Sequence, residues 1–166
     1  MRNRLISFVG FVLSLCTIGV CASLALAITP PEIRGQGEVL ITPDMHGREL
    51  TEYEFVKADL RGFDLSEADL RGAVFNNSQL QKADLHGADM EDVVGFASLF
   101  DGADLTDANL TNALLMESVF GEAQIEGADF TNAILDKVQQ KNLCLRADGT
   151  NSITGVSTFD SLGCSR

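Results

Sequence analysis

Large apolar residues recur at every fifth position along most of this chain. Between Leu50 and Leu135, 17 of the 18 positions in this series are large and apolar, and Gly95 is the exception. The position two residues before each is also restricted, with Ala at 11 of the 18 and Ser at three. A helix repeats every 3.6 residues and a strand every two, so neither sustains a strict period of five. The pattern therefore predicts a repeat architecture.

Each five-residue unit predicts one straight segment followed by one corner. The small and large residues lie two positions apart, so an extended backbone points both to the same side. The next two residues are polar or Gly, as in 58–62 (Ala-Asp-Leu-Arg-Gly), and Gly supplies backbone freedom at a corner. Repeated corners wind the chain into a coil with an apolar interior. Each buried Leu or Phe contributes roughly 1.5–3 kcal/mol, so no cofactor is expected.

The N-terminal segment 1–27 has the pattern of a secretory signal. Arg2 and Arg4 precede an uncharged apolar run over 5–27 that ends in Ala-Leu-Ala. A positive start, an apolar stretch and a small-residue end are typical of a signal peptide, and we expect cleavage after Ala27. The alternative is a retained anchor, because the apolar run is long enough to span a bilayer. After cleavage, no stable membrane insertion is expected.

The charge balance limits the classes of partner. The chain has 24 acidic and 12 basic residues, a net charge of -12, and loss of Arg2 and Arg4 with the signal would make it -14. Such a chain has no basic surface for a phosphate backbone, so we expect no nucleic-acid partner. Its 45% apolar content is too high for a disordered protein.

Four cysteines divide between the signal and the rest of the chain. Cys16 and Cys21 would leave with the signal, so Cys144 and Cys164 remain. In an exported protein such a pair predicts a disulfide, which closes a loop of about 20 residues and contributes roughly 3 kcal/mol. Two free thiols are the alternative. With no His nearby in sequence, the pair is a poor metal site, and we expect no metal.

Several units have the form Ala-Asp-Leu-x-x or Ala-Asp-Phe-x-x, as at 68–72, 83–87 and 128–132, and they resemble the pentapeptide-repeat family. The resemblance implies an all-β solenoid, a right-handed quadrilateral β-helix with four units per coil and about 4.5 coils. The export signal, the repeat and the tail with Cys144 and Cys164 are together similar to thylakoid-lumen pentapeptide-repeat proteins of cyanobacteria and chloroplasts. This narrower resemblance implies a location in the thylakoid lumen or the periplasm.

The limits of the repeat predict four segments. They are a signal peptide (1–27), an N-terminal arm or cap (28–47), the β-helix (48–137) and a C-terminal cap helix with a disulfide loop (138–166). The ends of a solenoid expose core and backbone, so both need caps. Val138, Leu143 and Leu145 are spaced as the apolar stripe of a short helix, which Gly149 is placed to end.

The four-unit coil places particular residues in inward columns. Ser78, Ser98 and Ser118 share one column, where their hydroxyls can bond the backbone or one another. Gly95 interrupts another column, the one that contains Phe55. Two arrangements remain open: Phe75 or Phe96 fills the space, or a bulge turns Val94 or Phe96 inward.

Two outward sides of the coil are predicted to be acidic and one to be apolar. The candidate interaction surface consists of Val56, Val74, Val94, Phe96, Leu99, Leu114, Met116, Val119 and Ile134. A contiguous apolar surface usually marks a contact. Its cover is either the chain's own arm (28–47) or the tail after Gly149, or else a partner protein or a second copy. The acidic sides are expected to be a solvated surface, with a weak cation ladder as the alternative.

The search for catalytic chemistry is negative. His46 and His86 fall in the same column but two coils apart, so they are not in contact. The sequence has no phosphate-binding loop and no nucleophile elbow, so we expect no enzyme and no catalytic residues. The leading function is an exported scaffold or interaction module that docks an unknown protein partner through its apolar side.

Two alternatives come from other classes. Gyrase-protecting members of the family are DNA mimics, although the export signal opposes that role because gyrase is cytoplasmic. A cation-binding or purely structural lumenal protein is the second alternative.

Overall fold

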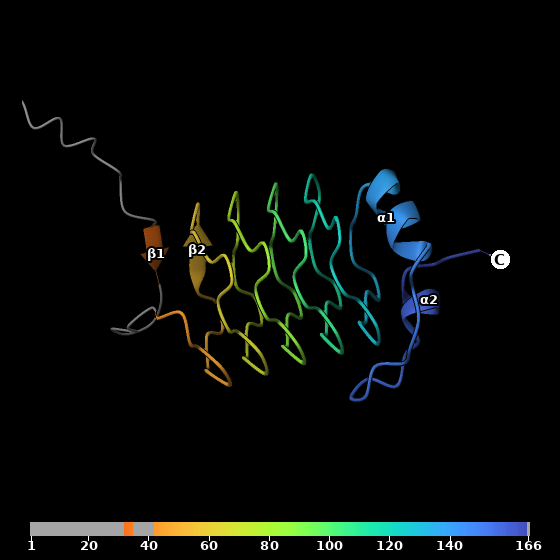
Figure 1. Ribbon diagram of the computed structural model, residues 1–166, viewed down its shortest axis with the longest axis horizontal. Helices are drawn as coiled ribbons and strands as arrows, with labels where there is room; N and C mark the ends of the chain where they lie inside the picture. The colour runs from red at the N-terminus through yellow and green to blue at the C-terminus, as the bar shows by residue number, and fades with distance from the viewer. Residues whose placement is uncertain (1–31, 35–41, 166) are drawn as a thin grey trace, which may run out of the picture.

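The chain winds into a stack of coils with helices at one end (Figure 1). This arrangement comes from a computed structural model, which describes residues 32–34 and 42–165. The predicted signal (1–27), with Cys16 and Cys21, and most of the predicted arm lie outside the described residues. The elements in chain order are β1 (Glu32–Arg34), β2 (Glu54–Val56), α1 (Lys137–Cys144) and α2 (Thr158–Ser161).

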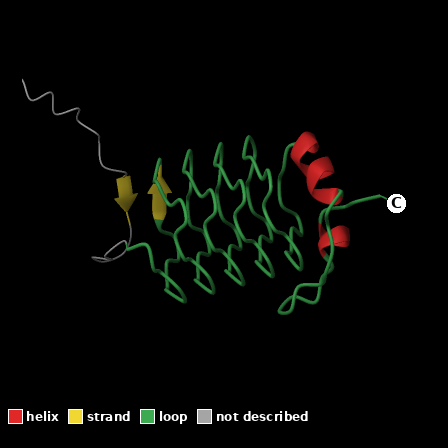
Figure 2. Ribbon diagram, viewed as in Figure 1, coloured by secondary structure: helices red, strands yellow, loops and turns green. Residues whose placement is uncertain are grey.

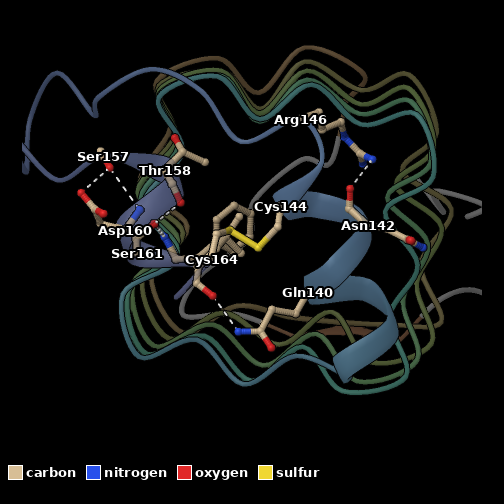
Figure 3. Close-up of a disulfide and its surroundings, with 11 residues drawn as sticks. Gln140, Asn142, Cys144, Arg146, Ser157, Thr158, Asp160, Ser161 and Cys164 are labelled. Carbon is tan, nitrogen blue, oxygen red and sulfur yellow. Dashed lines mark hydrogen bonds between the residues drawn. A yellow bond between two sulfur atoms is a disulfide. The ribbon is translucent and has the colours of Figure 1, made fainter. Parts of the chain in front are cut away.

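Each rung of the coil pairs with the equivalent rung of the next coil, as Asp44 does with Asp64. The bridges are parallel, and each joins single residues, so Figure 2 draws the coil mostly as loops and turns. Every inward residue of the series from Met45 to Leu115 donates its N–H to a carbonyl of the following coil, as Leu50 does to Asp69 at 2.7 Å. Four five-residue units therefore complete one turn, and the view along the axis has a rounded four-sided outline (Figure 3).

The predicted inward positions form the core. Every member of the series from Leu50 to Phe130 is buried, and Leu135 is partly buried. Rings stack between successive coils: the Phe55 and Phe75 centroids lie 5.0 Å apart, and those of Phe100 and Phe120 are also 5.0 Å apart. Burial of these side chains is the main stabilising contribution.

The serine column is buried and fully hydrogen-bonded. The Ser78 hydroxyl donates to the Phe55 carbonyl, and Ser98 donates to Phe75 in the same way one coil later. Each hydroxyl also accepts a backbone N–H, as Ser78 does from Ala58 at 3.0 Å. The hydroxyls thus join the backbones of neighbouring coils, so their burial leaves no polar group unsatisfied.

Gly95 is accommodated without a bulge. Val94 keeps its bridges to both neighbouring coils, and the Gly95 N–H donates to Leu114 at 2.8 Å. A Cβ on Gly95 would lie 2.9 Å from Leu115 Cδ2 and 3.8 Å from the Phe100 ring. Leu115 and Phe100 therefore occupy the space beside Gly95. The expectations of a bulge and of an inward Phe96 were wrong, since Val94 keeps its bridges and Phe96 points outward and is 39% exposed. Phe75, one coil earlier in the same column, is fully buried.

Most corners need a left-handed backbone, and not only at Gly. Gly62 has φ 68°, as its corner position predicted, but 11 described non-Gly residues also have φ between 53° and 62°. Ten of these are Asn or charged residues, and the other is Ala97. A left-handed conformation costs an L-residue roughly 1–2 kcal/mol, so the coil tolerates this cost at many corners.

A short antiparallel strand closes one edge of the first coil. β1 pairs with β2 in the register Glu32 with Val56, Ile33 with Phe55 and Arg34 with Glu54. This pairing supplies hydrogen-bond partners to an edge that would otherwise be open.

The C-terminal segment lies across the last coil (Figure 3). Leu143 of α1 is fully buried, whereas Val138 is 68% and Leu145 87% exposed, so the predicted apolar stripe was wrong except at Leu143. The Cys144–Cys164 disulfide joins the end of α1 to the tail, with 5.6 Å between Cα atoms. Gly149 does not end α1, because that helix stops at Cys144. No helix within the described ranges is long and apolar enough to cross a membrane.

Candidate functional site: an apolar side and its corner

The nine candidate surface residues fall on two adjoining sides of the coil. The first, here called the apolar side, is one ladder of bridged residues: Glu54, Val74, Val94, Leu114 and Ile134. The second, here called the mixed side, is the ladder of Asp59, Gln79, Leu99 and Val119. Phe96 and Met116 lie in the turns between these two sides, and Val56 ends β2. The coil therefore brings all nine onto one region of the surface.

The exposure of these residues rises along the coil. Val56, Val74 and Val94 are partly buried, and so are Leu99 and Val119. The larger side chains are more exposed: Phe96 is 39%, Leu114 40%, Met116 46% and Ile134 48% exposed. The most apolar surface thus lies on the third to fifth coils.

The described parts of the arm and tail adjoin only the two ends of the apolar side. β1 runs along the edge of β2, at one end of the apolar side. In the tail, the Asn151 side chain donates to the Asp107 carbonyl at 3.0 Å, and the Ser152 N–H donates to the Asp107 carboxylate at 3.0 Å. Asp107 lies in a turn between the two acidic sides. The tail therefore crosses the acidic region and leaves Leu114 and Ile134 exposed.

The aspartates of the acidic sides accept hydrogen bonds from the backbone of the turns that follow them. Asp84 accepts the N–H of His86 at 3.0 Å, and Asp104 accepts that of Thr106 at 2.9 Å. The same bond recurs wherever Asp precedes an inward residue in these ladders, because the side chain turns back to the residue two positions on.

Three aspartates of the coil, one on the mixed side and two on the acidic sides, have lowered pKa values. Hydrogen bonds from the Arg61 guanidinium lower the pKa of Asp59 below its usual range. Arg71 does the same to Asp69, and the Ser66 hydroxyl lowers the pKa of Asp64. These shifts belong to surface ion pairs and turns, which also perturb pKa values outside active sites.

Two shallow hollows adjoin the C-terminal tail. One, of about 450 Å³, lies between Ile153 and the acidic residues Glu67, Asp69, Asp89 and Asp107. The other, of about 400 Å³, lies between the end of the apolar side and α2. No group of three His, Cys, Asp or Glu side chains among residues 32–34 and 42–165 is arranged to hold a metal ion.

One surface residue was missed in the sequence. Ala97 follows Phe96 in the turn between the apolar and mixed sides, with φ 53°. The signal for it was present, because an Ala stands where the other non-Gly corner residues in this conformation are charged or Asn. The five-residue repeat by itself places Ala97 at an ordinary corner, so the repeat pattern does not single it out.

Comparisons with known proteins identify the repeat. A family model described as pentapeptide repeats matches eight copies, over residues 54–92 and 98–136. The gap between the two matches, 93–97, contains Gly95, Phe96 and Ala97. No curated protein matches the chain.

Solved structures of similar proteins include plant and cyanobacterial ones. A pentapeptide repeat protein from the Arabidopsis thaliana thylakoid lumen is 32% identical, with 75% of this chain and 91% of that one covered and a TM-score of 0.48. The pentapeptide repeat protein Rfr23 from the cyanobacterium Cyanothece 51142 is 24% identical, with 60% and 68% covered and a TM-score of 0.55. QnrB1, a plasmid-mediated fluoroquinolone resistance protein, is 17% identical, with 64% and 91% covered and a TM-score of 0.31.

Proposed function

Because the chain belongs to the pentapeptide-repeat family, we propose that it is an exported, non-enzymatic interaction module that docks a protein partner through its apolar side. Members of this family are generally structural or interaction proteins. The proposal includes the family's right-handed winding and the four segments 1–27, 28–47, 48–137 and 138–166. The first rung of the coil, at Asp44 and Met45, already lies within the second of these.

The observation that carries the proposal is the apolar ladder, whose last two residues stay exposed among the residues that the structure describes. Leu114 and Ile134 are both at least 40% exposed. At the equivalent outward positions of the acidic sides, the coil carries polar residues such as Asp104. Contiguous exposed apolar surface is costly in water, and it usually marks an interaction site. The nine residues Val56, Val74, Val94, Phe96, Leu99, Leu114, Met116, Val119 and Ile134 are the proposed surface.

Two features support export as part of this function. The signal pattern at 1–27 supplies a route, and the Cys144–Cys164 disulfide suits an oxidising compartment. We place the mature protein in the thylakoid lumen or the periplasm, where it acts without a bound cofactor.

The test combines Val94→Asp with Leu114→Asp. Two carboxylates on the apolar side should abolish co-purification of the partner from the native compartment, because they would be buried without a counter-charge. The coil should stay folded, since both side chains point outward. A matched control, Gln124→Asp with Asn142→Asp, adds the same charge at exposed positions away from this side and should bind normally.

The alternatives have separate outcomes. A gyrase-protecting DNA mimic would rescue gyrase from inhibition, and a cation-binding protein would release heat on calorimetric titration with calcium. Either result, with unchanged co-purification by the double variant, would replace the docking role. A purely structural role would be indicated if the folded wild-type protein captured no partner at all.

A further inference from the structure

The segment 93–97 reverses the usual distribution of large and small residues. At the other positions of the inward series the large side chain points into the coil, but here Gly95 is inside and Phe96 is outside. Burial of an aromatic ring is favourable, so an exposed Phe beside an inward Gly needs a separate reason. The family model also fails to match this segment, whereas it matches the repeats on both sides.

Ala97 provides a second departure at the same turn. It is the only apolar residue among the 11 described non-Gly residues with a left-handed backbone. Gly or Asn would adopt φ 53° at less cost than Ala. The chain therefore keeps a methyl group at a strained position beside an exposed aromatic ring.

These residues form a convex ridge. Phe96 and Ala97 make the turn between the apolar and mixed sides, and Met116 lies in the equivalent turn one coil later. Val94 and Leu114 adjoin the ridge on one side, and Leu99 and Val119 adjoin it on the other. Apolar surface that wraps around a corner fits a concave surface, because a flat one would touch only the corner.

Acidic residues flank this ridge on both sides. The turn before Val94 holds Glu91 and Asp92, and the turns after Leu99 and Val119 hold Asp101 and Glu122. Glu117 lies within the ridge itself, beside Met116. Cations are fewer. Arg71 lies one coil before Glu91 and pairs with Asp89, Lys82 packs beside Gly102, and Lys57 and Lys137 lie two coils from Ala97 at the same point of the coil, one on each side. The rim is therefore net negative, and complementary charge on a partner is positive.

We infer that Phe96, Ala97 and Met116 form a ridge that inserts into a concave apolar groove, rimmed by Lys or Arg, on a partner protein. This inference rests on the proposed function and specifies the partner's chemistry. A second copy of the chain does not fit, because it would oppose one convex ridge to another and one acidic rim to another. An anionic lipid surface would meet the same charge repulsion.

The experiment places p-benzoylphenylalanine at position 96 of the full exported chain and cross-links it in an extract of the native compartment. The cross-linked partner is purified, and its affinity for a set of variants is measured at about 50 mM and about 300 mM salt, which differ strongly in screening. Cross-linked partner residues should be apolar, with Lys or Arg around them.

The variants measure separately how much the ridge, the flat part of the apolar side and the acidic rim contribute to binding. Phe96→Ser and Met116→Ser should each weaken binding by at least about 10-fold, as expected for central anchors. Val74→Ser, on the flat part of the proposed surface, should weaken binding less than either ridge variant. The control Leu145→Ser, at an exposed apolar position outside that surface, should change binding by less than about threefold. Neutralising the rim with Glu91→Gln, Asp92→Asn, Asp101→Asn and Glu117→Gln should weaken binding at low salt and flatten the salt dependence.

Several results would overturn the inference. If Val74→Ser weakened binding as much as Phe96→Ser, the contact would be flat, and if the rim variant bound with unchanged salt dependence, the partner's rim would not be basic. Both could occur while Val94→Asp with Leu114→Asp still abolished binding, in which case the proposed function survives. Cross-links only between copies of this chain, or binding to lipid vesicles in place of protein, would also exclude it. No cross-linked partner at all would count against both proposals.

Discussion

At the scale of single residues, each aspartate before an inward residue bonds the turn that follows it. Asp84, Asp104 and Asp129 all accept the N–H of the residue two positions on, at 2.9 to 3.0 Å. The large number of aspartates is thus partly a consequence of the coil, because every side ends in a corner and an Asp side chain stabilises that corner. A ladder of carboxylates in this fold is not by itself a sign of cation binding.

Asp59 gives a test of pH dependence. The Arg61 guanidinium donates to its two oxygens at 2.7 and 2.6 Å and lowers the pKa of Asp59. A carboxyl group whose pKa is lowered by folding stabilises the protein above its unfolded pKa, and this contribution is lost as pH falls through the folded pKa. Arg61→Gln should therefore raise the pKa of Asp59, measured by NMR titration of the carboxyl carbon.

The effect on stability should be small, since both side chains are exposed and screened by solvent. Thermal unfolding of wild type and Arg61→Gln should differ slightly at pH 7 and converge below the pKa of Asp59. A difference that grew on acidification would contradict this account. Lys57→Gln, at an exposed corner, serves as the control for loss of one positive charge.

Gly95 gives a test of packing. A Cβ at this position would lie 2.9 Å from Leu115 Cδ2, and the φ of Gly95 is not in the left-handed region. Gly95→Ala should therefore lower the free energy of unfolding by about 1 kcal/mol through overpacking. In a Leu115→Ala background the same change should be neutral or stabilising, because the methyl group then enters a cavity. Urea unfolding of the four proteins measures the coupling, and an equal cost in both backgrounds would show that Leu115 is not the cause.

The contrast between Ser98 and Gly95 shows what the sequence can predict at this scale. The serine column followed from the four-unit period, because residues at the same point of successive coils are stacked. The filling of the Gly95 space did not follow, since it depends on how Phe100 from another side and Leu115 from the next coil meet inside. Periodicity fixes which side chains point inward, and it does not fix how neighbours from different columns share the volume.

At the scale of elements, the C-terminal segment supplies hydrogen bonds that the last coil lacks. The Phe130 N–H donates to the Ser161 hydroxyl at 3.0 Å, and the Gly127 N–H donates to the Asp148 carbonyl at 2.9 Å. Arg146, just beyond α1, donates to the carbonyls of Phe120 at 2.9 Å and Ala123 at 3.1 Å. The cap thus satisfies backbone groups as well as covering the core.

Arg146 tests this role. Arg146→Gln should lower the free energy of unfolding by about 1–2 kcal/mol, because two carbonyls lose a charged donor. Hydrogen exchange should accelerate first in the last coil, around Phe120 and Ala123, while the first coils keep their protection. Lys141→Gln, on the exposed surface of α1, removes the same charge and should have little effect. Uniform loss of protection along the coil would mean that Arg146 acts on global stability and not on the cap.

The expectation of a short helix after the repeat came from an apolar stripe, and the packing of that helix could not be derived from it. Leu143 is buried, but Val138 and Leu145 are mostly exposed. In a helix as short as α1, one side chain over the end of the coil and the disulfide at Cys144 determine the orientation. The route of the tail across the acidic sides could not be predicted from the sequence either, since it depends on single polar contacts such as that of Asn151 with Asp107.

At the scale of the whole molecule, the stack places like charges at regular intervals. Asp44, Asp64, Asp84 and Asp104 form one ladder with neighbouring rungs, on a chain of net charge -12. Strands in a sheet lie about 4.8 Å apart, so these carboxylates repel one another across successive coils. Repulsion between acidic sides opposes association through them and leaves the apolar side as the least charged surface for a contact, at some cost in stability.

Asp84→Asn separates the charge of this ladder from its hydrogen bond. Asn keeps a side-chain oxygen to accept the His86 N–H, but it removes one carboxylate between Asp64 and Asp104. At low salt the variant should gain about 0.5 kcal/mol in the free energy of unfolding, and the gain should vanish in about 0.5 M NaCl, where screening suppresses the repulsion. Asp84→Ala, which loses both charge and bond, should be less stable than Asp84→Asn at every salt concentration. A loss of stability in Asp84→Asn at low salt would show instead that the carboxylate makes a net favourable contribution, because its charge-assisted hydrogen bond to the His86 N–H outweighs repulsion along the ladder.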